Sequence, residues 1–213
     1  MISLALPHFT AEEFRRRAAH QKGGPLTEAW RDHGDHLLNT DMLLQLETMR
    51  LRDAAVLVPV VDDGADARII LTQRTMTLRK HSGQIAFPGG GIDEEDASAE
   101  DAALREAEEE IGLERRFVEP VGRLPQYLAG TGFRITPILS VVQPGFTLRP
   151  NPDEVADVFE VPLSFLMDPK NHRQESKVWN GVVRHFYVMP YRERTIWGVT
   201  AGILRTLYER LYA

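Results

Sequence analysis

The feature that most constrains the fold is one amphipathic helix set between runs of β-branched residues. Ser98, with Asp101 three residues later, predicts the start of this helix, and Gly112 predicts its end. Before the helix, an Asp-Asp-Gly turn separates two strand-like runs and predicts a hairpin of residues 54–61 and 68–74. After it come strand-like runs at 118–124, 133–142, 155–161 and 182–189, and a second helical pattern at 196–211. Strands on both sides of one helix predict an α/β fold with a mixed β-sheet sandwiched between helices.

The chain has 213 residues, a length between one typical domain and two, and no Ser/Gly linker or charge block divides it. Residues 1–50 are predicted to form an N-terminal helical extension packed on the domain, and residues 51–213 to form the domain itself. Within the extension, Thr10 and Glu13 have the spacing of a capping box, while Arg15, Arg16 and Arg17 are expected to form a solvated face.

Charge and composition exclude several classes of function. The formal net charge of −6 argues against a general nucleic-acid-binding protein, which needs a dense basic surface. Cysteine is absent, which excludes disulfides, thiolate zinc sites and thiol nucleophiles. No apolar run approaches the roughly 18 residues of a membrane span, and the first residues lack the pattern of a secretory signal. We therefore expect a soluble cytoplasmic protein with no membrane partner.

The predicted helix carries a concentration of carboxylates. Glu106, Glu109 and Glu110 stand at positions i, i+3 and i+4 and so share one face, whereas Glu108 points elsewhere. Like charges at this spacing repel one another, and a hard divalent cation converts that repulsion into binding. Oxygen ligands without a nearby His or Cys favour Mg²⁺ or Mn²⁺ over zinc. Taken alone, the helix is more typical of a solvated acidic surface than of a metal site.

A glycine turn precedes this helix. Gly89, Gly90 and Gly91 allow the backbone to approach a ligand closely, because glycine tolerates positive φ and has no side chain. The turn and the helix together resemble the Nudix box, G-x5-E-x7-R-E-U-x-E-E-x-G-U, in which U is a bulky aliphatic residue. The matching residues are Gly90, Arg105, Glu106, Glu109, Glu110, Gly112 and Leu113.

The match to the box departs from the pattern at two places. Asp96 stands where the pattern has its first Glu, with eight residues rather than seven before Arg105, and Ala107 occupies an aliphatic position. That first acidic residue is usually structural, so the departure concerns loop geometry more than chemistry. The resemblance implies a Nudix fold over residues 51–213.

A second motif lies upstream of the glycine turn. It resembles the additional signature of the coenzyme A pyrophosphatase branch, L-L-T-x-R-[S/A]-x3-R-x3-G-x3-F-P-G-G. The residues that match in register are Arg74, Arg79, Gly83, Phe87, Pro88, Gly89 and Gly90, while Thr75 replaces the Ser or Ala of the signature. This resemblance implies hydrolysis of the diphosphate bond of coenzyme A or acyl-coenzyme A, giving 3′,5′-ADP and (acyl-)4′-phosphopantetheine.

The two resemblances also imply roles for individual residues. Glu106, Glu109 and Glu110 would hold Mg²⁺ or Mn²⁺ and form the catalytic face with Arg105, which orients a glutamate by hydrogen bonding. Glu154, in a later loop, is a candidate general base or further ligand.

Substrate contacts are expected at the glycine turn and the two arginines upstream of it. Guanidinium groups suit phosphate oxygens, so Arg74 and Arg79 are the expected substrate contacts, together with the backbone of Gly89, Gly90 and Gly91. If neither arginine binds substrate, the pocket is expected around residues 127–134.

Several alternatives stay open from the sequence. The same box serves Nudix enzymes acting on ADP-ribose, dinucleotides, oxidised nucleotides or coenzyme A-capped RNA, although the net charge makes long RNA a poor partner. A non-catalytic ligand-sensing module is another alternative, but such a protein would be expected to lose the box carboxylates. The sequence also leaves open whether the chain is a homodimer.

Overall fold

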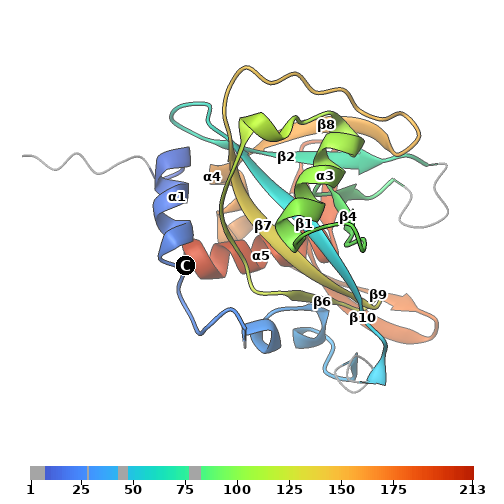
Figure 1. Cartoon of the computed structure of the whole chain (residues 1–213). Helices are drawn as coiled ribbons and strands as arrows, with labels where there is room; N and C mark the ends of the chain where they lie inside the picture. Colours follow the sequence, from blue (N-terminus) through green and yellow to red (C-terminus); the bar gives the residue numbers. More distant parts are fainter. Residues whose placement is uncertain (1–7, 28, 43–47, 77–82) are drawn as a thin grey trace, which may run out of the picture.

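The fold is built on a mixed β-sheet. A computed structural model describes residues 8–27, 29–42, 48–76 and 83–213 (Figure 1). Within these residues one sheet has eight strands, with the main order β3-β2-β1-β7-β5. Its central strand β1 (Arg52–Val61) runs parallel to β7 (Phe133–Val142) and antiparallel to β2 (Arg68–Arg74) and β4 (Gly89–Gly91). The predicted hairpin and the predicted mixed sheet are both confirmed.

The remaining strands complete this sheet and form a second, smaller one. The other strands of the large sheet are β3 (Ile85–Ala86), β5 (Val118–Arg123), β6 (Tyr127–Ala129) and β8 (Val155–Pro162). A three-stranded antiparallel sheet contains β9 (Arg173–Trp179), β10 (Val182–Tyr191) and β11 (Arg194–Trp197).

Helices lie on both sides of the large sheet. They are α1 (Ala11–Ala19), α3 (Ala99–Ile111), α4 (Leu163–Leu166) and α5 (Val199–Leu211). Short 3-10 turns are η1 (Ala29–Asp32), η2 (Asp35–Leu37), η3 (Arg115–Phe117) and η4 (Pro169–Asn171). Of the helices in the described residues, none has the length and hydrophobicity needed to cross a membrane.

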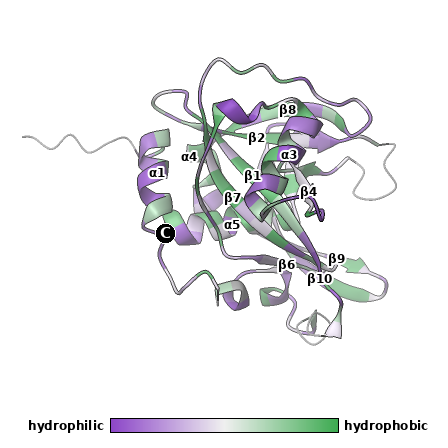
Figure 2. Ribbon diagram, in the orientation of Figure 1, coloured by the Kyte–Doolittle hydropathy of each residue, from purple (hydrophilic) through white to green (hydrophobic). Residues whose placement is uncertain are grey.

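The two-residue period of β1 explains why both faces of the sheet are covered. Ala55 and Leu57 pack in the cluster under α3, whereas Val58 and Val60 pack on the other face with residues of α1 and α5. A strand buried on both faces reads as a continuous apolar run, which is how β1 reads. Figure 2 shows hydrophilic residues on the outer faces of α1 and α3.

Helix α3 begins and ends where its capping residues predict. The Ser98 side chain accepts a hydrogen bond from the Asp101 N–H at 3.1 Å, and Gly112 adopts the left-handed conformation with φ of 67°. The last carbonyls of the helix are satisfied by a distant loop, in which Arg149 N–H donates to Ile111 and Asn151 N–H to Glu110. These bonds fix the loop that carries Glu154 against the C-terminal end of α3.

The N-terminal helix α1 follows its predicted start, but its arginines are not simply a solvated face. The Thr10 side chain accepts a hydrogen bond from the Glu13 N–H at 3.2 Å, as the capping spacing predicts. Arg17 is largely buried, donates to the Leu211 carbonyl at 2.7 Å and stacks on the Tyr212 ring. Only Arg16 has a side chain that is more than half exposed. The expectation was therefore wrong for Arg17, because the C-terminal helix packs beside α1 and offers it a carbonyl and a ring.

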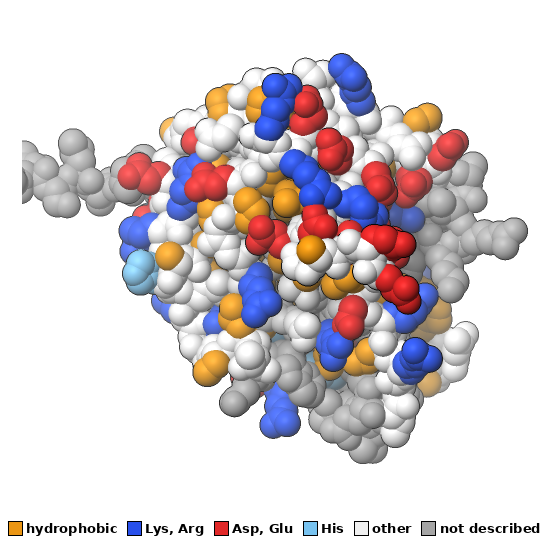
Figure 3. Space-filling view, viewed as in Figure 1, with side chains coloured by type: hydrophobic (Ala, Val, Ile, Leu, Met, Phe, Trp, Pro, Cys, Tyr) orange, Lys and Arg blue, Asp and Glu red, His pale blue; other side chains and the backbone are white. Residues whose placement is uncertain are grey.

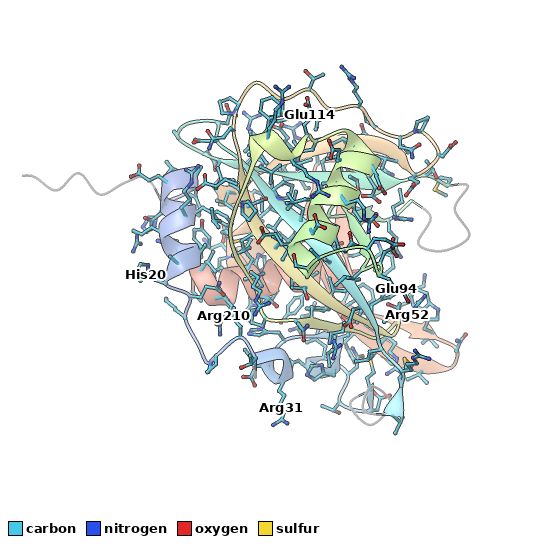
Figure 4. All side chains as sticks on the ribbon, viewed as in Figure 1. His20, Arg31, Arg52, Glu94, Glu114 and Arg210 are labelled. Carbon is cyan, nitrogen blue, oxygen red and sulfur yellow. The ribbon has the colours of Figure 1, made fainter. Side chains whose placement is uncertain are left out.

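The C-terminal helix starts later than predicted. Residues Arg194–Trp197 form strand β11, and α5 begins at Val199. Ile196 pairs with Met189 of β10, and Gly198, with φ of 64°, separates strand from helix. Pairing with β10, a tertiary interaction, overrides the helical pattern of residues 196–198. At the other end of α5, Arg210 donates to the Gly24 carbonyl at 3.1 Å and so holds the segment after α1 (Figure 4).

Candidate active site

The glycine strand β4 lies between β1 and helix α3. A side chain at Gly89 would place its Cβ 2.4 Å from the Ala55 carbonyl oxygen, and φ at this residue is 152°. A Cβ at Gly90 would lie 2.6 Å from both carboxylate oxygens of Glu106. Two successive glycines are therefore required for different reasons, one for the approach of β1 and the other for the approach of a carboxylate.

Glu110 is the most buried carboxylate of α3. Only 3% of the residue is exposed, its Oε2 accepts a hydrogen bond from the Gly89 N–H at 3.1 Å, and its Oε1 lies 3.5 Å from Nη1 of Arg74. Burial is the largest cause that raises the pKa of Glu110 to about 7, and the nearby carboxylates of Glu106 and Glu154 contribute to this rise. The hydrogen bond from Gly89 and the charge of Arg74 oppose this shift but do not cancel it.

Arg105 connects the other carboxylates of this face. Its guanidinium makes a two-pronged contact with Asp96, with N–O distances of 2.9 and 2.8 Å. Its Nη1 also donates to Glu106 at 2.9 Å and to Glu109 at 3.2 Å. Hydrogen bonding from Arg105 lowers the pKa of Asp96 to about 2, so Asp96 holds the arginine as a permanent anion. The residue that departs from the box pattern thus anchors the loop to the helix.

The four glutamates at the C-terminal end of α3 point in different directions. Glu106 and Glu110 face the glycine strand, and burial together with the charges of Glu109 and Glu154 raises the pKa of Glu106. Glu109 is on the outer side, with 58% of its side chain exposed, and it meets Glu106 only through Arg105. Glu108 faces away and lies 3.6 Å from Arg115. Figure 3 shows acidic and basic side chains mixed over this helix and the loop beside it.

The donor set of this face fits a hard divalent cation in its chemistry. Glu106 and Glu110 are carboxylates withdrawn from water; the charge of Glu154 raises the pKa of both, and the charge of Glu109 raises the pKa of Glu106. Such a site gains from a cation that offsets the repulsion. As the side chains stand, no three His, Cys, Asp or Glu of the described residues are close enough together to hold an ion.

Of the two upstream arginines, Arg74 is among the residues that the structure describes. Its side chain is 27% exposed, its Nη1 contacts Glu110, and its Nε is buried without a hydrogen-bond partner among the described residues. An unused N–H beside the carboxylates is suited to an anionic group of a ligand. Arg79 lies outside the described residues.

A cavity of about 800 Å³ adjoins the glycine strand, and Arg74 is part of its wall. Gly130, Thr131 and Phe133, from the region 127–134, also line it. Two further parts of the wall, the segment of Asp35 and Asn39 and the hairpin of β9 and β10, were not predicted from the sequence. A signal for the hairpin was present, since Asn180-Gly181 is flanked by apolar residues, and both residues have positive φ.

Comparison with known proteins decides the family. The NUDIX domain model matches residues 51–180. The chain belongs to the Nudix family. An uncharacterized Nudix hydrolase, NudL, of Escherichia coli K12 is 42% identical over 161 residues, which cover 76% of this chain and 83% of the relative. NudL of Citrobacter koseri is 43% identical over 169 residues, with the same coverage, and that of Salmonella paratyphi B is 41% identical over 177 residues, covering 81% and 92%.

Membership in the Nudix family identifies the general activity of the chain. The chain is a Nudix hydrolase, and hydrolases of this family generally use divalent metal ions such as Mg²⁺ or Mn²⁺. The matched region contains β4, α3 and the loop of Glu154, whereas α1 and the segment from Asp35 to Met42 lie before it. The wall of the cavity formed by this N-terminal segment is therefore an addition to the matched domain.

Proposed function

We propose that this Nudix hydrolase cleaves the diphosphate bond of coenzyme A or its acyl derivatives, giving 3′,5′-ADP and (acyl-)4′-phosphopantetheine. The observation that carries the proposal is the surroundings of the glycine strand. Carboxylates contact the strand on one side, Arg74 lies beside it, and a large cavity adjoins it. A diphosphate placed at this strand would lie beside the proposed cation site, and the cavity would leave space for the rest of the substrate. The upstream signature that includes Arg74 supports coenzyme A as the substrate class.

Glu106, Glu109 and Glu110 are the proposed ligands of Mg²⁺ or Mn²⁺. When bound, the ion neutralises charge on the diphosphate and lowers the pKa of a water molecule, which makes it a better nucleophile. Arg105 positions Glu106 and Glu109 by hydrogen bonding, and the Gly89 N–H holds Glu110. Glu154 is close enough for its charge to raise the pKa of both Glu106 and Glu110, which supports a role for it as base or additional ligand.

The proposal is tested with purified protein, Mg²⁺ or Mn²⁺ and a panel of nucleoside diphosphate derivatives, with the products identified by mass. We expect 3′,5′-ADP and 4′-phosphopantetheine from coenzyme A, and the acylated product from acyl-coenzyme A. A far higher kcat/KM for ADP-ribose, a dinucleotide or an oxidised nucleotide would contradict the substrate class. Absence of cleavage of every compound, with tight binding of one, would support a ligand-sensing module instead.

The role of Arg74 is tested with a pair of substrates that differ by one phosphate. If its guanidinium binds the 3′-phosphate, Arg74→Ala raises KM about 10- to 100-fold for coenzyme A, the equivalent of a charge-assisted contact, and much less for dephospho-coenzyme A. An equal rise for both substrates would assign the guanidinium to the diphosphate. Arg79→Ala is tested in the same way, because the sequence motif predicts a substrate contact there too.

A further inference from the structure

The cavity beside the glycine strand has a distinct wall made by the small C-terminal sheet. Trp179 and Val182 face each other across the β9–β10 hairpin and both line the cavity. Trp197 of β11 stacks against Trp179 with ring centroids 6.5 Å apart, and Phe186 lies 5.5 Å from the Trp197 ring. The result is a continuous aromatic and aliphatic surface, which we call the hairpin wall and define as Trp179, Val182, Phe186 and Trp197.

The hairpin wall uses only one face of the β9–β10 ladder. Val178 and Val183 form the next cross-strand pair, so their side chains lie on the opposite face, and neither lines the cavity. Their exposed fractions are 65% and 51%, compared with 51% for Trp179 and 42% for Val182. The hairpin therefore offers two apolar faces of similar chemistry, and only one of them is turned toward the glycine strand. Figure 2 shows hydrophobic residues in this hairpin, at the lower right of the molecule.

The charged groups around the cavity are distributed unevenly. Apart from His185, the cationic residues of the described lining are Arg74, which lies at the glycine strand beside Glu110 and keeps one unpaired N–H, and Arg184, which is paired with Asp41 at 2.7 Å. The lining carboxylate, Asp35, accepts hydrogen bonds from the Tyr127 hydroxyl and the Gly130 N–H. The four residues of the hairpin wall are uncharged, although the same face of the hairpin also carries Arg184 and its cross-strand partner Lys177, whose Nζ lies 5.7 Å from the centre of the Trp179 ring. A phosphorylated nucleoside needs unpaired cations, whereas an uncharged, flexible arm needs apolar surface.

The N-terminal segment holds the hairpin in place. The Asn39 amide donates to the carbonyls of Asp35 and His185 at 2.8 and 2.9 Å, and its oxygen accepts from the His185 N–H at 2.8 Å. Asn39 is 5% exposed. A buried side chain with three hydrogen bonds fixes β10 against the segment before β1, so the wall is formed before substrate arrives.

We infer that the hairpin wall binds the acyl-pantetheine arm of the substrate and makes hydrolysis favour acylated over free coenzyme A. This inference rests on the proposed function. With the diphosphate at the glycine strand, one arm of the substrate enters the cavity, and the uncharged arm matches its apolar surface better than the 3′-phosphorylated nucleoside does. A volume of about 800 Å³ is in the range of small-molecule sites and accommodates such an arm.

The test compares free, acetyl-, butyryl-, hexanoyl- and octanoyl-coenzyme A as substrates of the full chain. Each methylene buried on an apolar wall contributes up to about a fourfold gain, so kcat/KM is expected to rise by about two- to fourfold per carbon until the cavity is filled. Val182→Asp places a charge in the wall and is expected to flatten this rise. Val183→Asp places the same charge one residue away on the opposite face and is expected to leave the rise unchanged.

A binding measurement without metal separates recognition from catalysis. In the presence of EDTA, the Kd of octanoyl-4′-phosphopantetheine is expected to be weakened about tenfold or more by Val182→Asp, while the Kd of 3′,5′-ADP stays unchanged. Calorimetry gives both values, and unfolding midpoints check that the two variants are folded. If Val182→Asp destabilises the hairpin, Trp179→Ala with Val178→Ala as its control replaces the pair.

The outcomes distinguish the inference from the function on which it rests. Cleavage of all coenzyme A forms with equal kcat/KM, or equal effects of Val182→Asp and Val183→Asp, would overturn the role of the hairpin wall and leave the proposed function intact. Weaker binding of 3′,5′-ADP in Val182→Asp would show that the nucleotide occupies the cavity and would also overturn it. No cleavage of any coenzyme A form, with cleavage of another diphosphate, would overturn both.

Discussion

Two buried glutamates, one in α1 and one in α3, show how the same residue in similar helices serves different purposes. Glu13 and Glu110 are 6% and 3% exposed. Glu13 accepts three hydrogen bonds of 2.6 to 2.7 Å from Arg16 and Arg17, and the bond from Arg16 is the largest cause that lowers its pKa to about 2. Glu110 has a backbone N–H at 3.1 Å and an arginine at 3.5 Å, and burial raises its pKa to about 7.

Glu13 and Glu110 differ in how completely their negative charge is paired, not in how deeply they are buried. A carboxylate that is desolvated and fully paired contributes to structure, because its charge is already neutralised. One that is desolvated and poorly paired, with further carboxylates nearby, retains charge for a ligand to neutralise. The two residues therefore predict opposite consequences of the same substitution: Gln in place of Glu13 costs stability, and Gln in place of Glu110 costs activity.

The largest effect is expected from the carboxylates of α3. Glu109→Gln and Glu110→Gln are each expected to lower kcat by about 100-fold or more, because a ligand of a hard cation loses its charge. Binding of Mn²⁺, followed by electron paramagnetic resonance, is expected to weaken in parallel. The free energy of unfolding of Glu110→Gln without metal is expected to stay equal or rise, since a desolvated charge has been removed.

Glu108→Gln is the matched control on the same helix. Its side chain is 49% exposed and faces Arg115, so kcat and Mn²⁺ affinity are expected to be close to those of the unmodified chain. Equal losses at residues 108, 109 and 110 would contradict the assignment of one helical face to the metal.

A smaller effect is expected from the glycine strand. Gly90→Ala places a methyl group 2.6 Å from the carboxylate of Glu106, so the carboxylate must move. We expect a loss of about 10- to 100-fold in kcat or metal affinity, the range found when the support of a metal ligand is disturbed. Gly91→Ala is the control, because nothing lies within 4 Å of a Cβ at that position, and its loss is expected to be much smaller. A larger loss in Gly91→Ala than in Gly90→Ala would mean that activity does not depend on the present position of the Glu106 carboxylate.

The smallest effect is expected from Glu13, and on stability alone. Glu13→Gln removes the ionic part of its hydrogen bonds with Arg16 and Arg17 and is expected to lower the free energy of unfolding by about 1 kcal/mol, since the exposed side of Arg16 is screened by solvent. Activity is expected to stay unchanged. Urea unfolding of both proteins at neutral pH, with a parallel assay of diphosphate cleavage, measures the two quantities.

The stabilisation that the Glu13 carboxylate provides is expected to depend on pH in one direction. The pKa of Glu13 falls from an ordinary 4.5 to about 2 on folding, so its contribution is complete above about pH 4.5 and is lost as the pH falls toward 2. The gap in unfolding free energy between the unmodified chain and Glu13→Gln is therefore expected to narrow over that range. A gap that stays constant from pH 5 to pH 2 would mean that the charge of Glu13 does not stabilise the fold.

The sequence by itself determined the elements whose signals are local. The limits of α3 follow from Ser98 and Gly112, which act within one helical turn, and the burial of β1 on both faces follows from its apolar run. The spacing of Glu106, Glu109 and Glu110 is likewise local, because a helix sets which side chains share a face, although Glu109 is turned outward with 58% of its side chain exposed while the other two face the glycine strand. The same helical spacing predicts that Glu108 points away from these three residues, and in the structure it lies 3.6 Å from Arg115.

Tertiary structure alone decided which charges are compensated and what surrounds the cavity. The inward position of Arg17 depends on the C-terminal helix beside α1, and the strand at Arg194–Trp197 depends on pairing with β10. The cavity is lined in part by the N-terminal segment of Asn39, the glycine strand and the β9–β10 hairpin, which are far apart along the chain. Contacts between distant segments leave no periodic pattern in any one of them, so only the folded chain brings the apolar hairpin to the glycine strand.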